Sequence, residues 1–115
     1  MTERQVKTMS IPMTVKTEFG TYEDCRLSVG RYFDDDTLCI RVYNAKDGPI
    51  ATITKCLREP HWRAEKAYVD TNNCPWAPAF ISEYKLGKPT GKRKRSGYCT
   101  YPQYEFDRKV LGDFV

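Results

Sequence analysis

The sequence predicts a single α+β domain over residues 1–115, in which an antiparallel β-sheet of about five to six strands packs against one amphipathic helix. Two patterns carry this prediction. Hydrophobic residues in the first half alternate with polar ones, which is the period of a strand, whereas aromatic residues later in the chain recur every four positions, as in a helix. The composition, 40% hydrophobic and 13% aromatic, suffices for the core of one domain of this length.

Residues 12–57 are predicted to form a β-meander of four antiparallel strands, after a flexible N-terminal segment, residues 1–11. Gly20, the aspartates 34–36 and the Asp47-Gly48 pair suit the turns between the strands. The residues predicted to face inward are Met13, Val15, Thr17 and Phe19, then Cys25, Leu27, Val29 and Phe33, then Leu38, Ile40 and Val42, and last Ala51, Ile53 and Leu57.

The middle of the chain is predicted to be a loop and a short strand. The stretch "REPHWRAEK" is polar and contains Pro60, which favours a loop, and "KAYVD" follows it as a strand.

An amphipathic helix is predicted over residues 73–86. Trp76, Phe80 and Tyr84 lie four residues apart and therefore share one face. Pro75 suits the first turn and Gly87 follows the predicted end. A second proline, Pro78, indicates that the first turn is irregular or that the regular helix begins later.

The C-terminal part is predicted to contain a basic loop, residues 88–97, and a last strand, residues 98–106. Glycines flank the cations of the loop, and Pro102 favours an edge position for the strand, because proline cannot donate a ladder hydrogen bond. The tail after residue 106 either packs through Val110, Leu111 and Phe114 or frays.

The basic loop is the candidate binding site. The net charge is +4, and six of the 19 basic residues fall between Lys85 and Arg95 with no acidic residue among them. Such cations can contact phosphates, dock on an acidic protein surface or remain solvated, and neighbouring tyrosines can stack on unpaired bases or anchor a protein partner. The predicted contact residues are Lys88, Lys92, Arg93, Lys94, Arg95, Tyr98 and Tyr101.

The residue types of catalytic and metal sites do not form a recognisable pattern. The five cysteines are widely spaced, without a CxxC pair, and are predicted to be reduced, half-buried side chains. His61 is the single histidine and lies in a polar loop, and the aspartates 34–36 suit a turn better than a metal site. We therefore expect no enzymatic activity, no cofactor and no metal.

The hydrophobic pattern also predicts where in the cell the protein is located. The N-terminal residues lack the apolar core of a signal peptide, and nowhere does an apolar run approach the length that spans a bilayer. We expect a cytoplasmic protein without a membrane partner.

The stretches "AYVDTNNCPWAPAFISEYKLGKPTG" and "SGYCTYPQYEFD", within residues 65–107, resemble a small family of unknown function that is carried by conjugative transposons and phages of gut bacteria. The first half of the chain is similar to this family only in its strand pattern. The "KRKR" run is more basic than the family pattern, and Pro78 stands where a polar helix former is expected.

The resemblance implies a mobile-element accessory protein, and it brings no catalytic residue with it. Small proteins of this kind often act stoichiometrically, by disabling a host defence machine such as a CRISPR effector or by assisting transfer of the element. The leading expectation is a non-enzymatic binding module that acts on a host or element protein. The alternative is a nucleic-acid-binding accessory protein that uses the same basic loop and tyrosines.

Overall fold

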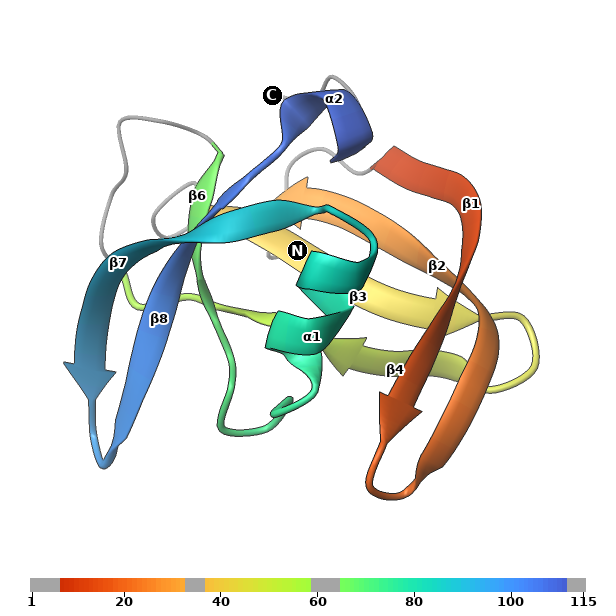
Figure 1. Cartoon of the computed structure of the whole chain (residues 1–115), viewed down its shortest axis with the longest axis horizontal. Helices are drawn as coiled ribbons and strands as arrows, with labels where there is room; N and C mark the ends of the chain where they lie inside the picture. The colour runs from red at the N-terminus through yellow and green to blue at the C-terminus, as the bar shows by residue number, and fades with distance from the viewer. Residues whose placement is uncertain (1–6, 33–36, 59–64, 112–115) are drawn as a thin grey trace.

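The computed structural model describes residues 7–32, 37–58 and 65–111. Within these residues the chain forms two four-stranded antiparallel sheets and two short helices, so the predicted α+β class is confirmed. The expected single sheet of five to six strands is corrected to two sheets. Figure 1 shows the first sheet on the right, the second on the left, and helix α1 in front between them.

The first sheet is the predicted meander, with the strand order β1-β2-β3-β4. Its strands are β1 (Lys7–Thr17), β2 (Gly20–Arg31), β3 (Leu38–Asn44) and β4 (Gly48–Thr52). Strand β1 begins at Lys7, inside the segment predicted to be flexible, because residues 7–9 pair with the far end of β2.

The alternation of the sequence identifies most of the inner face of this sheet. Met13 and Val15 of β1 are buried, as are the predicted residues of β2 and β3 that the structure describes. Phe19 is an exception, since 87% of its surface is exposed. Strand β1 ends at Thr17, whose hydroxyl donates to the Gly20 carbonyl (3.0 Å) and accepts from the Phe19 N–H (3.1 Å), so Phe19 lies in the turn.

The second sheet has the strand order β5-β6-β8-β7. Its strands are β5 (Thr54–Lys55), β6 (Lys66–Val69), β7 (Gly87–Ser96) and β8 (Cys99–Phe106). Ile53 connects the sheets, because its N–H donates to the Ile40 carbonyl (3.0 Å) and its carbonyl accepts from the Asp70 N–H (2.8 Å). The two sheets therefore share one hydrophobic core.

The prediction that the last strand is an edge strand is wrong, because β8 lies between β6 and β7. The pairing explains how Pro102 is tolerated there. Among the described residues, β6 pairs with β8 from Gln103 onward, so Pro102 lies one residue beyond that ladder and is opposite Arg93 of β7 alone.

Helix α1 (Ala77–Glu83) is shorter than the predicted 73–86. The residues before it are held in a turn by Asp70, whose carboxylate accepts from the Asn73 N–H (3.2 Å) and side-chain amide (3.0 Å). The Cys74 N–H also donates to the Asp70 carbonyl (2.8 Å). This local bonding competes with helix formation, and Pro78 then falls in the first turn of the actual helix, where it costs no helical hydrogen bond.

The predicted aromatic face of α1 packs in the core. Phe80 lies edge-on to both Trp76 (5.7 Å between ring centroids) and Tyr84 (5.2 Å). The Tyr84 hydroxyl accepts from the Thr14 N–H (2.7 Å), which ties the helix to β1. The helix thus contacts β1 and shares the hydrophobic core of the two sheets.

The helix ends in a Schellman motif before the predicted end at residue 86, so Gly87 is not the glycine that terminates it. The Leu86 N–H donates to the Ile81 carbonyl (2.9 Å) and the Lys85 N–H to the Ser82 carbonyl (3.2 Å), with Lys85 in the left-handed conformation at φ 54°. Gly87 serves a different need, since a Cβ there would lie 2.6 Å from the Glu105 carbonyl oxygen of β8.

Replacing Lys85 by glycine should therefore stabilise the protein by about 0.5–1 kcal/mol, because glycine relieves the left-handed backbone at a modest entropic cost. Urea unfolding measures the change. Lys88→Gly is the control of opposite sign, since Lys88 has ordinary strand geometry and is exposed. A loss of stability in Lys85→Gly would contradict the role given to this backbone conformation.

The C-terminal tail packs through helix α2 (Arg108–Leu111), in which Leu111 is buried and Val110 lies against the core. The predicted packing of these two residues is confirmed, and Phe114 lies outside the described residues.

Candidate functional site

The cations of the predicted basic loop belong to a strand. The expectation of a loop over 88–97 is wrong, because β7 pairs with β8 to form a hairpin. Two glycines make this possible. Gly91 has φ 92° at the irregularity between Pro89 and Arg93, and Gly97 has φ 63° in the two-residue turn between Ser96 and Cys99.

The outer half of this hairpin, residues 93–102, is a two-stranded ribbon. Its pairs run from Arg93 opposite Pro102 to Ser96 opposite Cys99, whereas the pairing of β8 with β6 stops at Gln103. In Figure 1 this part of β7 and β8 extends away from α1 and β6. We call residues 93–102 the basic arm.

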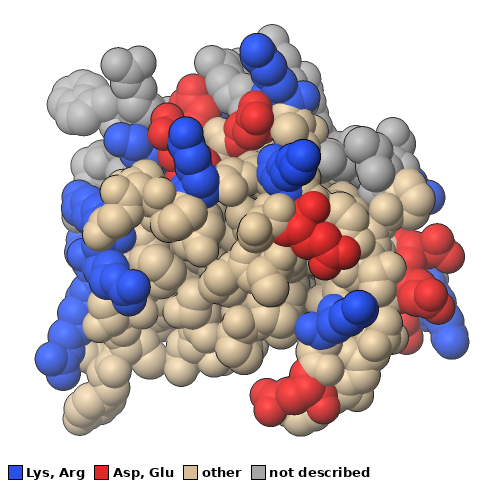
Figure 2. Space-filling model, in the orientation of Figure 1, with Lys and Arg blue, Asp and Glu red and all other residues tan. Residues whose placement is uncertain are grey.

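Exposed cations follow the edge formed by β7. Lys88, Lys92, Arg93 and Arg95 are exposed and Lys94 is half-buried. Figure 2 shows Lys and Arg side chains gathered along this side of the molecule. At the end of the arm the Arg95 Nε donates to the Gly97 carbonyl (3.2 Å), which holds this guanidinium beside the turn.

The two faces of the basic arm carry different cations, because side chains alternate along a strand. Arg93 and Arg95 share one face with Thr100, which lies opposite Arg95. Lys94 lies on the other face, opposite Tyr101.

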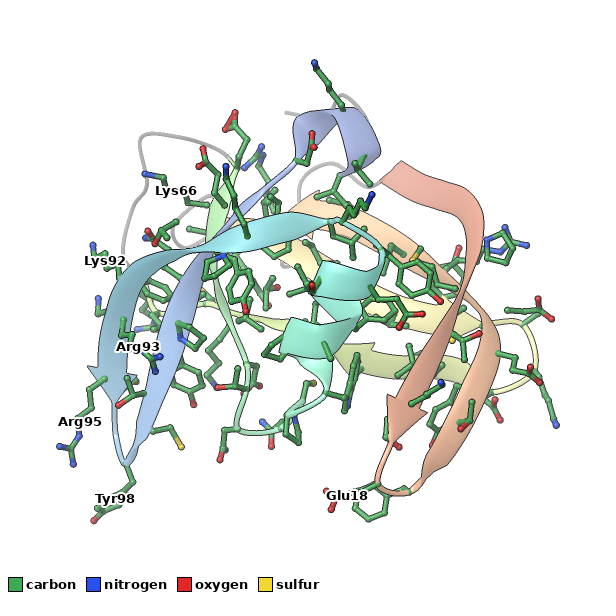
Figure 3. All side chains as sticks on the ribbon, in the orientation of Figure 1. Glu18, Lys66, Lys92, Arg93, Arg95 and Tyr98 are labelled. Carbon is green, nitrogen blue, oxygen red and sulfur yellow. The ribbon has the colours of Figure 1, made fainter. Side chains whose placement is uncertain are left out.

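Two further lysines, which the sequence did not single out, lie on the lysine face. The register places Lys66 opposite Glu105, and Lys55 opposite Tyr68, on the side of the sheet that carries Lys94. Figure 3 shows Lys66 near the base of the hairpin, above Lys92. The alternation in "KAYVD" could have indicated the side chain direction of Lys66, but the neighbouring strands could not be known from it.

The two tyrosines of the candidate site differ in their exposure to solvent. Figure 3 shows Tyr98 at the tip of the arm, and 99% of its surface is exposed. Tyr101 is 5% exposed. The Lys55 ammonium lies over the Tyr101 ring, 6.0 Å from the ring centroid. Burial, with a smaller contribution from Cys99, raises the pKa of the Tyr101 phenol. Tyr101 therefore packs against Lys55, and its role as a contact residue stays a prediction.

The hollow at the base of the hairpin does not extend the basic strip. It has a volume of about 610 Å³, and Lys85, Lys88 and Lys109 contribute to its lining. Glu65, Glu105 and Asp107 line the same hollow, so the cations there have acidic neighbours. The excess of positive charge is thus concentrated along the arm.

The other sequence candidates gain no support from the structure. His61 and the aspartates 34–36 lie outside the described residues. Across residues 7–32, 37–58 and 65–111, no group of His, Cys, Asp and Glu side chains could hold a metal ion.

All five cysteines are free thiols, with Cys25, Cys39 and Cys74 buried and Cys56 and Cys99 half-buried. Desolvation raises the pKa of Cys74 from 9.0 to about 11, and that of Cys25 also rises. At pH 8 we expect Ellman's reagent to modify Cys56 and Cys99 first, since a rise of two pKa units lowers the thiolate fraction about 100-fold.

A kinetic assay with and without denaturant checks this order of reactivity. The Cys56→Ser, Cys99→Ser double variant should lose the fast phase and keep the reactive groups that denaturant exposes. A fast phase that survives in the double variant would show that a thiol described as buried is accessible.

No helix in the described part of the chain is long and apolar enough to cross a bilayer.

Comparison with known proteins identifies one relationship. Residues 26–115 match the model of a protein family described as a domain of unknown function, DUF4313. No curated protein and no solved structure matches the chain.

Proposed function

The chain belongs to the DUF4313 family, and because the function of that family is unknown we propose one from the geometry: a non-enzymatic accessory module that binds nucleic acid through the β7–β8 hairpin. The observation that carries the proposal is a projecting two-stranded arm with exposed cations and no acidic residue along β7. Cations held on a strand contact phosphates without a further ordering cost for the backbone.

The burial of Tyr101 favours phosphates over a protein surface as the main partner. A stable protein interface needs an apolar centre, with charges at its rim. Tyr101 and Tyr104 are buried, which leaves Tyr98 as the exposed aromatic side chain of the hairpin. The surface of the arm is then mainly cationic and polar, which suits a polyanion.

A protein partner remains a second candidate, because of the tip. Tyr98 and Arg95 lie together there, and tyrosine and arginine are the residue types enriched at the centres of protein interfaces. This reading corresponds to a module that acts stoichiometrically on a host or element protein, including a defence complex.

A salt titration distinguishes the two candidates. The full chain is titrated against fluorescent single-stranded DNA, duplex DNA and RNA at about 50 mM and about 150 mM salt, and phosphate binding should weaken at least 10-fold over this range. Failure to bind any of these nucleic acids at the lower salt concentration would overturn the proposal and leave the protein partner.

The setting of this activity follows from the resemblance in residues 65–107. In a mobile element or phage of a bacterial host, the module would act in the cytoplasm, where the DNA of the element is copied and transferred. It would act stoichiometrically in that setting.

A further inference from the structure

The arm has the form of a structural element that enters a DNA groove. Residues 93–102 are two paired strands. Between Gln103 and the tip of the hairpin, the described residues place no third strand beside β8. Paired strands lie about 4.8 Å apart, and the major groove of B-form DNA, about 12 Å wide, admits such a ribbon. A longer β6 would have widened the sheet and prevented this approach.

We propose that the arm binds duplex DNA in the major groove, with its arginine face toward the base edges; this inference rests on the proposed function. Arg93, Arg95 and Thr100 are exposed on that face. Arginine pairs with two acceptors of guanine, O6 and N7, and a threonine hydroxyl can donate or accept. The face therefore carries groups that read bases as well as groups that contact phosphates.

The spacing of the two arginines along the strand matches two successive base-pair steps of B-form DNA. Alternate residues of a strand lie about 6.6 Å apart, and successive base pairs of B-form DNA rise about 3.4 Å. Arg93 and Arg95 would reach guanines about two base-pair steps apart. Lys94 and Lys55 lie on the opposite face, where they raise the local positive potential, whereas Lys66 on that face lies opposite Glu105, which offsets its charge.

Single-stranded nucleic acid and duplex RNA fit this surface less well. Proteins that hold single strands stack successive bases on several aromatic side chains. The hairpin exposes Tyr98, whereas Tyr101, Tyr104 and Phe106 are buried. The major groove of A-form RNA is too narrow and deep for side chains to read.

The test compares nucleic acids of one guanine-containing sequence: duplex DNA, each single DNA strand, duplex RNA, and duplex DNA with 7-deazaguanine in place of guanine. The last removes the N7 acceptor of the major groove and leaves the phosphate charge unchanged. Fluorescence anisotropy should give at least 10-fold tighter binding to ordinary duplex DNA than to each of the other three.

Two control variants separate the arginine face from general charge. Arg93→Lys, Arg95→Lys keeps the charge and should reduce discrimination against 7-deazaguanine. Lys16→Arg, Lys46→Arg changes exposed cations of the first sheet and should leave the discrimination against 7-deazaguanine unchanged. Circular dichroism confirms that each variant is folded.

Each outcome decides the inference. Equal or tighter binding of single strands or duplex RNA, or indifference to 7-deazaguanine, overturns the major-groove proposal while nucleic-acid binding stands. Absence of binding to every nucleic acid overturns the proposed function itself, and the groove proposal with it.

Discussion

Replacing Arg93 and Arg95 by serine will weaken binding to duplex DNA roughly 10- to 100-fold at about 50 mM salt and lower the slope of log affinity against log salt by about 2. Both side chains are exposed on the basic arm, so their loss removes phosphate or base contacts without opening the core. Titrations at several salt concentrations give the affinity and the slope together.

A matched variant shows whether position or net charge is responsible. Lys16→Ser, Lys46→Ser removes the same charge from exposed positions on the first sheet. We expect it to change affinity less than about 3-fold, since exposed charges far from a binding site are largely screened. Equal losses in the two double variants would mean that the chain binds through its overall charge, and the arm would lose its assigned role.

Replacing Phe80 by alanine will lower the free energy of unfolding by about 3–5 kcal/mol, the largest effect expected for a single substitution here. Phe80 is 4% exposed and lies between Trp76 and Tyr84, in the core shared by the two sheets and α1. The substitution removes both ring contacts and leaves a cavity that three separate elements would have to close.

Urea unfolding followed by tryptophan fluorescence and circular dichroism measures this loss. Phe19→Ala is the control, because the same atoms are removed from a side chain that is 87% exposed, and we expect a change within about 0.5 kcal/mol. A loss below about 1 kcal/mol for Phe80→Ala would show that α1 contributes little to the stability of the core.

The binding titrations of the two double variants can be interpreted only together with stability measurements, which show whether a variant is folded. Arg93 and Arg95 lie outside the core, whereas Phe80 lies inside it, so loss of binding and loss of stability should occur in different variants. A binding defect in Phe80→Ala would then report unfolding.

Sequence patterns predicted the elements that bury one face. Met13 and Val15 alternate with polar residues because one face of β1 packs in the core, and the spacing of Trp76, Phe80 and Tyr84 reflects the same requirement in α1. The burial of one face imposes a period on the residues, and a period can be read directly from the sequence.

The same reasoning failed for β7, because this strand is at the edge of its sheet and most of its side chains are exposed on both faces. Such a strand has no hydrophobic period, so the sequence pattern over residues 88–97 predicts a loop. The start of α1 was also missed, since the Asp70 carboxylate captures Asn73 in a turn that helical periodicity does not show.

The sequence by itself determined the α+β class, the meander of the first half and the position of the positive charge, because these depend on residue type and local spacing. The tertiary structure alone decided that the cations lie on a two-stranded arm, that Tyr98 is exposed at its tip and that Tyr101 is buried. The physical reason is that these properties depend on where β6 stops along β8 and on the approach of Lys55 to Tyr101, contacts between segments far apart in the chain.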